Sequence, residues 1–232
     1  MNKKFSVIVA DPPWNFKDTL NMSDVKRGAL ANYSTMSILD IKQLSVKDIA
    51  DPDGAILCLW VPSAILQDGL DVMKAWSFSH KQIYIWNKSK ILPFKELVVS
   101  FSKNIRKALK DGTWQISKIR EILNSAITDF DLNKTLSFGM GRLFRNCHEI
   151  CLIGTNGNKI YKQLQNRSQR SVSFAPNLGH STKPEHLQNS LEIMFPSANK
   201  LELFARRVRP NWECLGNEID GLDIRDALDK LK

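Results

Sequence analysis

The motif Asp11-Pro12-Pro13-Trp14, which follows a short apolar run, constrains the fold of this chain more than any other segment. The run Phe5–Ala10 contains three consecutive β-branched residues at positions 7–9, a pattern typical of a strand buried on both faces of a sheet. Two consecutive prolines cannot continue the hydrogen-bond ladder, so the strand must end there. Asp11 is therefore expected at the carboxyl end of a central strand, where open α/β sheets bind their ligands.

The residue types of this motif suit the binding of a planar base by its exocyclic amino group. The prolines lack an N–H, so we expect their carbonyls to be free acceptors on a rigid backbone. The Asp11 carboxylate and the Pro12 carbonyl could then accept both amino N–H bonds and direct the nitrogen lone pair at a methyl donor. Trp14 would add a flat stacking face. The alternative is that strand-Asp-Pro forms an ordinary turn here.

An alternation of strands and helices predicts an α/β fold with a largely parallel sheet. The expected strands are Phe5–Ala10, Ala55–Val61, Ser79–Trp86, Glu149–Gly154, Ser171–Phe174 and Lys200–Phe204, and the expected helices are Ile38–Ser45, Ser63–Ala75 and Pro184–Met194. Ser181 or Thr182 is expected to cap the last of these helices. With 232 residues, the chain is expected to form a single domain, residues 1–232.

Residues 89–137 interrupt the alternation and predict a two-helix insertion. Helical spacing over Phe94–Leu109 and Ile116–Ile127 is separated by Asp111-Gly112, a turn signal. The first helix carries four cations close together, namely Lys103, Arg106, Lys107 and Lys110. Two interpretations stay open: a solvated amphipathic hairpin that covers one sheet edge, or a target-recognition element whose cations contact a substrate.

The charge of the chain favours a polyanionic partner. The formal net charge is +9 and the pI is near 9.4. Basic residues also gather near positions 118–120, 142–145 and 159–170, and the last two groups contain Tyr, Gln and Asn rather than carboxylates. Because these cations are not neutralised by neighbouring acids, nucleic acid is the expected partner.

Other signals narrow the class of protein. No opening stretch has the pattern of a signal peptide and no apolar run approaches the length of a membrane span, so we expect a cytoplasmic protein without membrane contact. The four cysteines are scattered, which indicates reduced thiols. Cys147, His148 and Cys151 lack a paired knuckle and a nearby fourth ligand, so no metal site is expected.

Further segments follow the Asp11–Trp14 motif in a fixed order. They are Asn32–Ser37, Leu57–Val61, Trp86-Asn87-Lys88, Arg145–Glu149, His180–Pro184, Lys200–Arg206 and Trp212–Glu218. Together they resemble the MT-A-seventy family of S-adenosylmethionine-dependent adenine N(6)-methyltransferases, in its prokaryotic or phage DNA-type form. The resemblance covers most of the chain except Ser89–Ser137.

This resemblance implies a Rossmann-like methyltransferase sheet in permuted order, in which the catalytic motif precedes the cofactor-binding strand, with S-adenosylmethionine as cofactor. The implied catalytic residues are Asp11, Pro12, Pro13 and Trp14; the implied cofactor-binding residues are Lys183, Glu202, Arg206, Asn217 and Glu218; the implied substrate-side residues are Tyr33 and Glu149. Glu202 lies in an otherwise apolar strand and needs a partner. A purely structural pair with Arg206 is the alternative to a role in binding.

The activity implied by the resemblance is methyl transfer to the amino nitrogen of adenine in nucleic acid, with DNA as the expected substrate. An adenine in a duplex would be flipped out, with Tyr33 or Trp14 replacing its stacking partners. The alternatives are an RNA adenine methyltransferase, a cytosine N(4)-methyltransferase and a non-catalytic nucleic-acid-binding paralogue. A homodimer or a paralogous subunit is a further possible partner.

Overall fold

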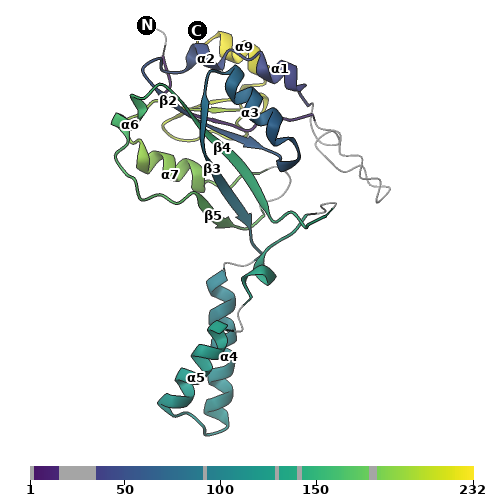
Figure 1. Cartoon of the computed structure of the whole chain (residues 1–232), viewed down its shortest axis with the longest axis vertical. Helices are drawn as coiled ribbons and strands as arrows, with labels where there is room; N and C mark the ends of the chain where they lie inside the picture. The colour runs from purple at the N-terminus through teal and green to yellow at the C-terminus, as the bar shows by residue number, and fades with distance from the viewer. Residues whose placement is uncertain (1–2, 16–34, 91–92, 129–130, 140–142, 178–181) are drawn as a thin grey trace. The chain divides into compact units, whose positions relative to one another are not determined.

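The computed structural model describes residues 3–15, 35–90, 93–128, 131–139, 143–177 and 182–232 (Figure 1). Its strands are β1 (Val7–Ala10), β2 (Ala55–Val61), β3 (Ser79–Lys88), β4 (His148–Asn156), β5 (Val172–Ala175), β6 (Lys200–Leu203) and β7 (Trp212–Leu215). Its helices are α1 (Ile38–Lys42), α2 (Val46–Ile49), α3 (Leu66–Ala75), α4 (Pro93–Lys110), α5 (Ile116–Thr128), α6 (Ile160–Gln163), α7 (His186–Met194), α8 (Asn217–Asp220) and α9 (Ile224–Asp229), with 3-10 turns η2 (Ser63–Ile65) and η3 (Leu132–Thr135).

The chain divides into two compact units. The sheet unit comprises Met1–Ile85, Glu149–Ser171 and Glu185–Lys232, and the hairpin unit comprises Trp86–His148 and Val172–Pro184. No helix among the described residues is long and apolar enough to cross a membrane.

The strands form a mixed seven-stranded sheet in the order β5-β3-β4-β2-β1-β6-β7, which is the α/β architecture expected from the sequence. β1 runs parallel to β2 and to β6, with Val9 level with Cys58 on one side and Glu202 on the other. β7 is parallel to β6, whereas β4 is antiparallel to β2. The expectation of a largely parallel sheet is therefore correct for β1, β2, β6 and β7 and wrong for β4.

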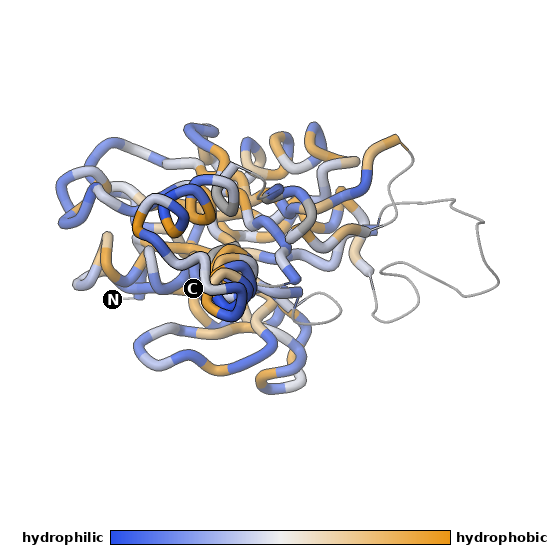
Figure 2. Tube along the Cα trace, turned by 90° about the horizontal axis from the view of Figure 1, so that it is seen from below, coloured by the Kyte–Doolittle hydropathy of each residue, from blue (hydrophilic) through white to orange (hydrophobic). Residues whose placement is uncertain are grey.

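Helices cover both faces of the sheet unit. Alternate residues of the strands, such as Ile8 on β1 and Leu57 on β2, join the hydrophobic core with residues of α1, α2, α3 and α9. On the other face, α7 buries Leu187 and Leu191. Gly69 lets α3 approach β2, because a Cβ there would lie 2.6 Å from the Val61 side chain. The alternating hydrophobic and hydrophilic stretches in Figure 2 follow from elements that each bury one face.

Element boundaries differ from the sequence prediction at two places that matter for the site. α7 begins at His186 rather than Pro184, and Glu185 precedes it without a side-chain capping bond, so Thr182 does not cap it; Ser181 lies outside the described residues. β7 and the two short helices that follow it were not predicted. Trp212–Leu215 is only four residues long and has no strict alternation of apolar and polar side chains.

In the hairpin unit, the two expected helices of the 89–137 segment are α4 and α5. The Asp111-Gly112 turn joins them, and Gly112 adopts a positive φ of 67° that favours glycine.

Candidate active site at the carboxyl ends of the parallel strands

The parallel strands bring several predicted site residues to one edge of the sheet unit. Because β1, β2, β6 and β7 are parallel, the segments after each of them meet at their common carboxyl edge. These segments contain Asp11–Trp14, Arg206 and Asn217-Glu218. β4 runs the other way, so its first residues reach the same edge, with Ile150 opposite Val61. Glu149, which precedes Ile150, therefore also lies at this edge.

The Asp11–Trp14 motif forms a tight turn tied to its neighbours. The Asp11 N–H donates to the Leu203 carbonyl of β6 at 3.5 Å, and the Trp14 N–H donates to the Pro12 carbonyl at 2.9 Å. The Pro13 carbonyl accepts from the Met36 N–H at 2.9 Å. The expectation that both proline carbonyls are free is therefore wrong. Since a carbonyl oxygen has two lone pairs, the Pro12 carbonyl retains capacity for one further donor.

Trp14 is buried rather than presented as a stacking face. Only 4% of its surface is exposed, and its indole N–H donates to the Trp60 carbonyl of β2 at 2.9 Å. The ring packs in the hydrophobic core and fixes the turn against β2. Its expected stacking role is corrected to one of positioning Asp11 and Pro12.

Glu202 is the only acid on β6, and it lies in a polar pair with α7. The Gln188 amide nitrogen donates to Glu202 Oε1 at 3.2 Å, while Arg206 pairs instead with Glu218. Burial raises the pKa of the Glu202 carboxyl above its ordinary value. The Gln188 hydrogen bond and the charges of Arg207 and Arg209 lower this pKa, and the Asp11 charge adds a smaller increase. Glu202 thus has Gln188 as a hydrogen-bond partner, and Arg206 has Glu218 as an ionic partner.

The amide oxygen of Gln188 lacks a hydrogen-bond donor among the described residues. Gln188 is almost fully buried, and within the described part of the chain no donor reaches its Oε1. A buried acceptor without a donor costs free energy unless a ligand supplies one. The Gln188 and Glu202 pair thus offers acceptor atoms for a ligand with N–H or O–H groups.

The backbone after β6 adopts an unusual conformation. Phe204 has a positive φ of 62°, which is rare for an aromatic residue and occurs most often at functional sites. Gly216 lies against the backbone of Ala205, and a Cβ at position 216 would approach the Ala205 carbonyl oxygen too closely for any side chain. This close approach fixes the loops after β6 and β7 together and explains why position 216 is glycine.

Arg206, Asn217 and Glu218 lie on these two loops. Arg206 Nε and Glu218 Oε1 are 3.7 Å apart, and both side chains are partly open to solvent. Asn217 is the first residue of α8 and is exposed. The three predicted cofactor residues therefore lie on adjacent segments with their polar groups accessible.

Sequence reasoning missed the role of Arg209, which sits in the basic loop that follows Arg206. Arg209 Nε donates to Glu192 at 2.8 Å, its Nη1 lies 3.3 Å from Glu185, and its side chain is only 13% exposed. The Trp212 indole N–H donates to the same Glu192 oxygen at 2.7 Å. Arg209 thus ties the loop between β6 and β7 to α7. The separation of 17 residues between Arg209 and Glu192 gave no local signal.

The remaining predicted residues lie elsewhere. Lys183 belongs to the hairpin unit and is partly buried. The four cations of α4, namely Lys103, Arg106, Lys107 and Lys110, are all exposed on the hairpin unit. Tyr33 lies outside the described residues.

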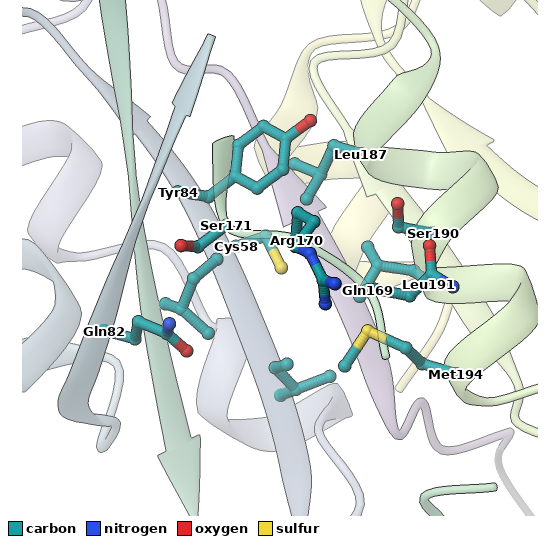
Figure 3. Close-up of a pocket in the computed structure, with 12 residues that line it drawn as sticks. Cys58, Gln82, Tyr84, Gln169, Arg170, Ser171, Leu187, Ser190, Leu191 and Met194 are labelled. Atoms are coloured by element: carbon teal, nitrogen blue, oxygen red, sulfur yellow. The ribbon is translucent and has the colours of Figure 1, made fainter. Parts of the chain in front are cut away.

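A small pocket opens on the sheet unit between α7 and the middle of β2, β3 and β4 (Figure 3). Cys58, Leu191 and Met194 supply apolar walls, and Gln82 and Arg170 are among its polar lining residues. None of the site residues predicted from the sequence lines it, and Cys58 lies in the interior of β2 rather than at its carboxyl end.

The known proteins that are similar to this chain include several named as methyltransferases. The family model described as MT-A70 matches residues 5–104 and 99–218. The chain is 28% identical over 225 residues to the N(6)-adenosine-methyltransferase MT-A70-like protein of Drosophila melanogaster. It is 26% identical over 225 residues to the human N(6)-adenosine-methyltransferase catalytic subunit METTL3.

These alignments cover 96% of this chain but 28% and 30% of the two relatives, so the chain spans less than a third of their length. The Type II methyltransferase M.MunI of Mycoplasma sp is 25% identical over 232 residues, which is 94% of this chain and 78% of that protein.

Proposed function

Since this chain belongs to the MT-A70 family, we propose that it transfers a methyl group from S-adenosylmethionine to the exocyclic amino nitrogen of adenine in DNA. The observation that carries the proposal is the position of Asp11 and the Pro12 carbonyl at the carboxyl edge of the sheet. Asp11 lies two residues after Val9, which pairs with Glu202 in the β1 and β6 ladder.

S-adenosylmethionine is the methyl donor of MT-A70 methyltransferases. The buried Gln188 Oε1 without a donor and the Glu202 carboxyl fit a ligand rich in N–H and O–H groups. We assign Glu202, Arg206, Asn217 and Glu218 to the cofactor: the two carboxylates can accept from hydroxyls, the guanidinium can donate, and the Asn217 amide can do both. The resemblance also implies Lys183 as a cation for the carboxylate of S-adenosylmethionine.

Asp11 and Pro12 act on the substrate amino group. The amino nitrogen of adenine is a poor nucleophile, because its lone pair is delocalised into the ring. Hydrogen bonds from both amino N–H groups, to the Asp11 carboxylate and to the remaining lone pair of the Pro12 carbonyl, favour a nitrogen whose lone pair is available. S-adenosylmethionine, when bound, would supply the methyl group. The nitrogen held by Asp11 and Pro12 would bond to the methyl carbon as the carbon–sulfur bond breaks, S-adenosylhomocysteine would remain, and the extra amino proton would pass to water. No strong base is required for that loss.

The proposed substrate contacts are of two kinds, to the base and to the phosphate backbone. Glu149, at the carboxyl edge, and Tyr33 are proposed on the base side, with Tyr33 as the stacking partner of a flipped adenine. The exposed cations of α4 are proposed to contact backbone phosphates. The choice of DNA rests on the sequence resemblance and on the type II methyltransferase among the relatives. RNA is the alternative that the N(6)-adenosine-methyltransferase relatives favour.

The test uses the full chain with methyl-labelled S-adenosylmethionine and matched DNA and RNA pools, followed by digestion to nucleosides. We expect label in N(6)-methyl-2′-deoxyadenosine from the DNA pool. Label in N(6)-methyladenosine alone would change the substrate to RNA, and label in N(4)-methylcytosine would contradict the adenine assignment. Tight binding of nucleic acid without any transfer would indicate a non-catalytic paralogue.

A further inference from the structure

The turn between α4 and α5 exposes an aromatic side chain at the tip of the hairpin. Trp114 is 62% exposed, although tryptophan is a residue that proteins bury or place in interfaces. Leu109 and Ile116 on either side are 56% and 80% exposed. Three large apolar residues within eight positions therefore face solvent in this structure.

The tip has a defined backbone. The N–H groups of Asp111, Gly112 and Thr113 donate to the last carbonyls of α4 at 2.9, 3.3 and 3.0 Å, and the Thr113 hydroxyl donates to the Ala108 carbonyl at 3.3 Å. Because these bonds satisfy the carbonyls that a helix end leaves open, the turn is fixed without help from the apolar side chains. The exposure of Trp114 is therefore not needed to close the hairpin.

The surface around the tip is cationic. Residues 93–128 contain seven lysines and arginines and three acids. Lys103, Arg106, Lys107 and Lys110 recur at intervals of three or four residues, so they form one stripe along α4 that leads to the tip. Lys118 on α5 is already paired with Glu121 at 2.8 Å, which leaves the α4 stripe as the main positive surface of the hairpin.

An exposed aromatic ring at the tip of a hairpin that also carries a stripe of cations fits nucleic acid better than a second protein. Cations follow the phosphate backbone, and an aromatic ring stacks on any base that leaves its neighbours. A protein partner for the same apolar tip would have to carry a strongly acidic surface as well. The charge complementarity therefore selects a polynucleotide as the occupant.

We propose that Trp114 stacks on a base of the nucleic acid whose phosphates contact the Lys103, Arg106, Lys107 and Lys110 stripe of α4. This inference rests on the proposed function, because it requires a nucleic-acid substrate, and it assigns a base-contacting residue outside the catalytic edge.

The test compares Trp114→Ala, Trp114→Phe and the control Ile116→Ala in binding to a fluorescently labelled DNA duplex and to the matching single strand at several salt concentrations. We expect Trp114→Ala to weaken binding about five- to hundredfold, the range for losing one base stack. Trp114→Phe retains an aromatic face and is expected to stay within a few-fold of wild type. Ile116→Ala, which removes apolar surface at the same tip, is expected to have little effect.

The salt dependence separates stacking from phosphate contacts. Replacement of all four α4 cations by Ala should flatten the plot of log affinity against log salt, by about 0.9 for each phosphate contact on duplex DNA. Trp114→Ala should leave that slope unchanged, because indole carries no charge. Thermal melting of each variant checks its folding.

Several outcomes would overturn the proposal. Wild-type binding by Trp114→Ala would do so, as would equal losses for Trp114→Ala and Ile116→Ala. Unchanged DNA binding with a shift in sedimentation would assign the tip to a contact between copies. The proposed function fails separately, if the wild-type chain methylates neither DNA nor RNA.

Discussion

At the scale of single residues, the site places Asp11 and Glu202 on neighbouring strands with different surroundings. Asp11 follows β1 at the edge, whereas Glu202 lies inside β6 with Gln188 beside it. Burial raises the pKa of Glu202, so its carboxyl holds the proton more tightly in the folded protein than in the unfolded chain. The unfolded chain releases this proton at lower pH, so ionisation of Glu202 destabilises the folded state as pH rises above the ordinary value of 4.5.

Glu202→Gln is predicted to change stability and binding in opposite directions. The stability of the variant relative to wild type should increase with pH above about 4.5, because Gln cannot ionise. Its affinity for S-adenosylmethionine should fall about ten- to hundredfold, the range for a lost hydrogen bond to a charged group. Urea unfolding at several pH values and calorimetric titration measure the two effects.

The control for that experiment is Glu213→Gln on β7, because Glu213 forms a surface pair with Lys3. We expect it to change neither property appreciably. A Glu202→Gln variant with unchanged cofactor affinity would remove Glu202 from the cofactor site.

At the scale of elements, the sequence predicts those strands and helices whose ends and burial follow from a local residue pattern. β2 runs from Ala55 to Val61 as predicted, since Gly54 and Pro62 bound a fully buried apolar run. No local pattern predicted that β4 is antiparallel to β2, because this pairing depends on residues 89 to 101 positions apart. The same limit applies to the buried indole of Trp14, the Gln188 partner of Glu202 and the Arg209 cluster, since each depends on a contact between distant segments.

Arg209 should stabilise the sheet unit more than its neighbour Arg207. Arg209→Ala leaves Glu192 without its closest cation and should cost about 1–3 kcal/mol of unfolding free energy. Arg207 is 51% exposed and pairs with Glu185. Arg207→Ala should therefore lower the unfolding free energy by only about 0–1 kcal/mol.

The pH dependence provides an independent check on Arg209. Its hydrogen bond lowers the pKa of Glu192, so that part of the stability is present above the ordinary pKa of 4.5 and is lost as pH falls through the lowered value. The difference in unfolding free energy between wild type and Arg209→Ala should therefore become smaller at acidic pH. Equal costs for the Arg207 and Arg209 variants in urea unfolding would show that the loop is not held by the Arg209 cluster.

At the scale of the whole molecule, the two units carry different chemistry. The sheet unit holds Asp11, Glu202 and the loops after β6 and β7, while the hairpin unit holds Lys183, the α4 cations and Trp114. Phosphate contacts position a nucleic acid without specifying its sequence, so the hairpin unit is expected to contribute affinity and the sheet unit to contribute the reaction. The net charge of +9 is consistent with that division.

The most direct measurement of the central claim is single-turnover methyl transfer to DNA by wild type and Asp11→Asn at saturating S-adenosylmethionine, with a calorimetric measurement of cofactor affinity for each. The exposed acid Asp53, which pairs with Lys159, supplies the control Asp53→Asn. We predict that Asp11→Asn slows formation of N(6)-methyl-2′-deoxyadenosine about 100- to 1,000-fold, the effect of losing one preorganised contact. Cofactor affinity should stay within a few-fold, and Asp53→Asn should behave as wild type. Near-wild-type turnover by Asp11→Asn would contradict the account.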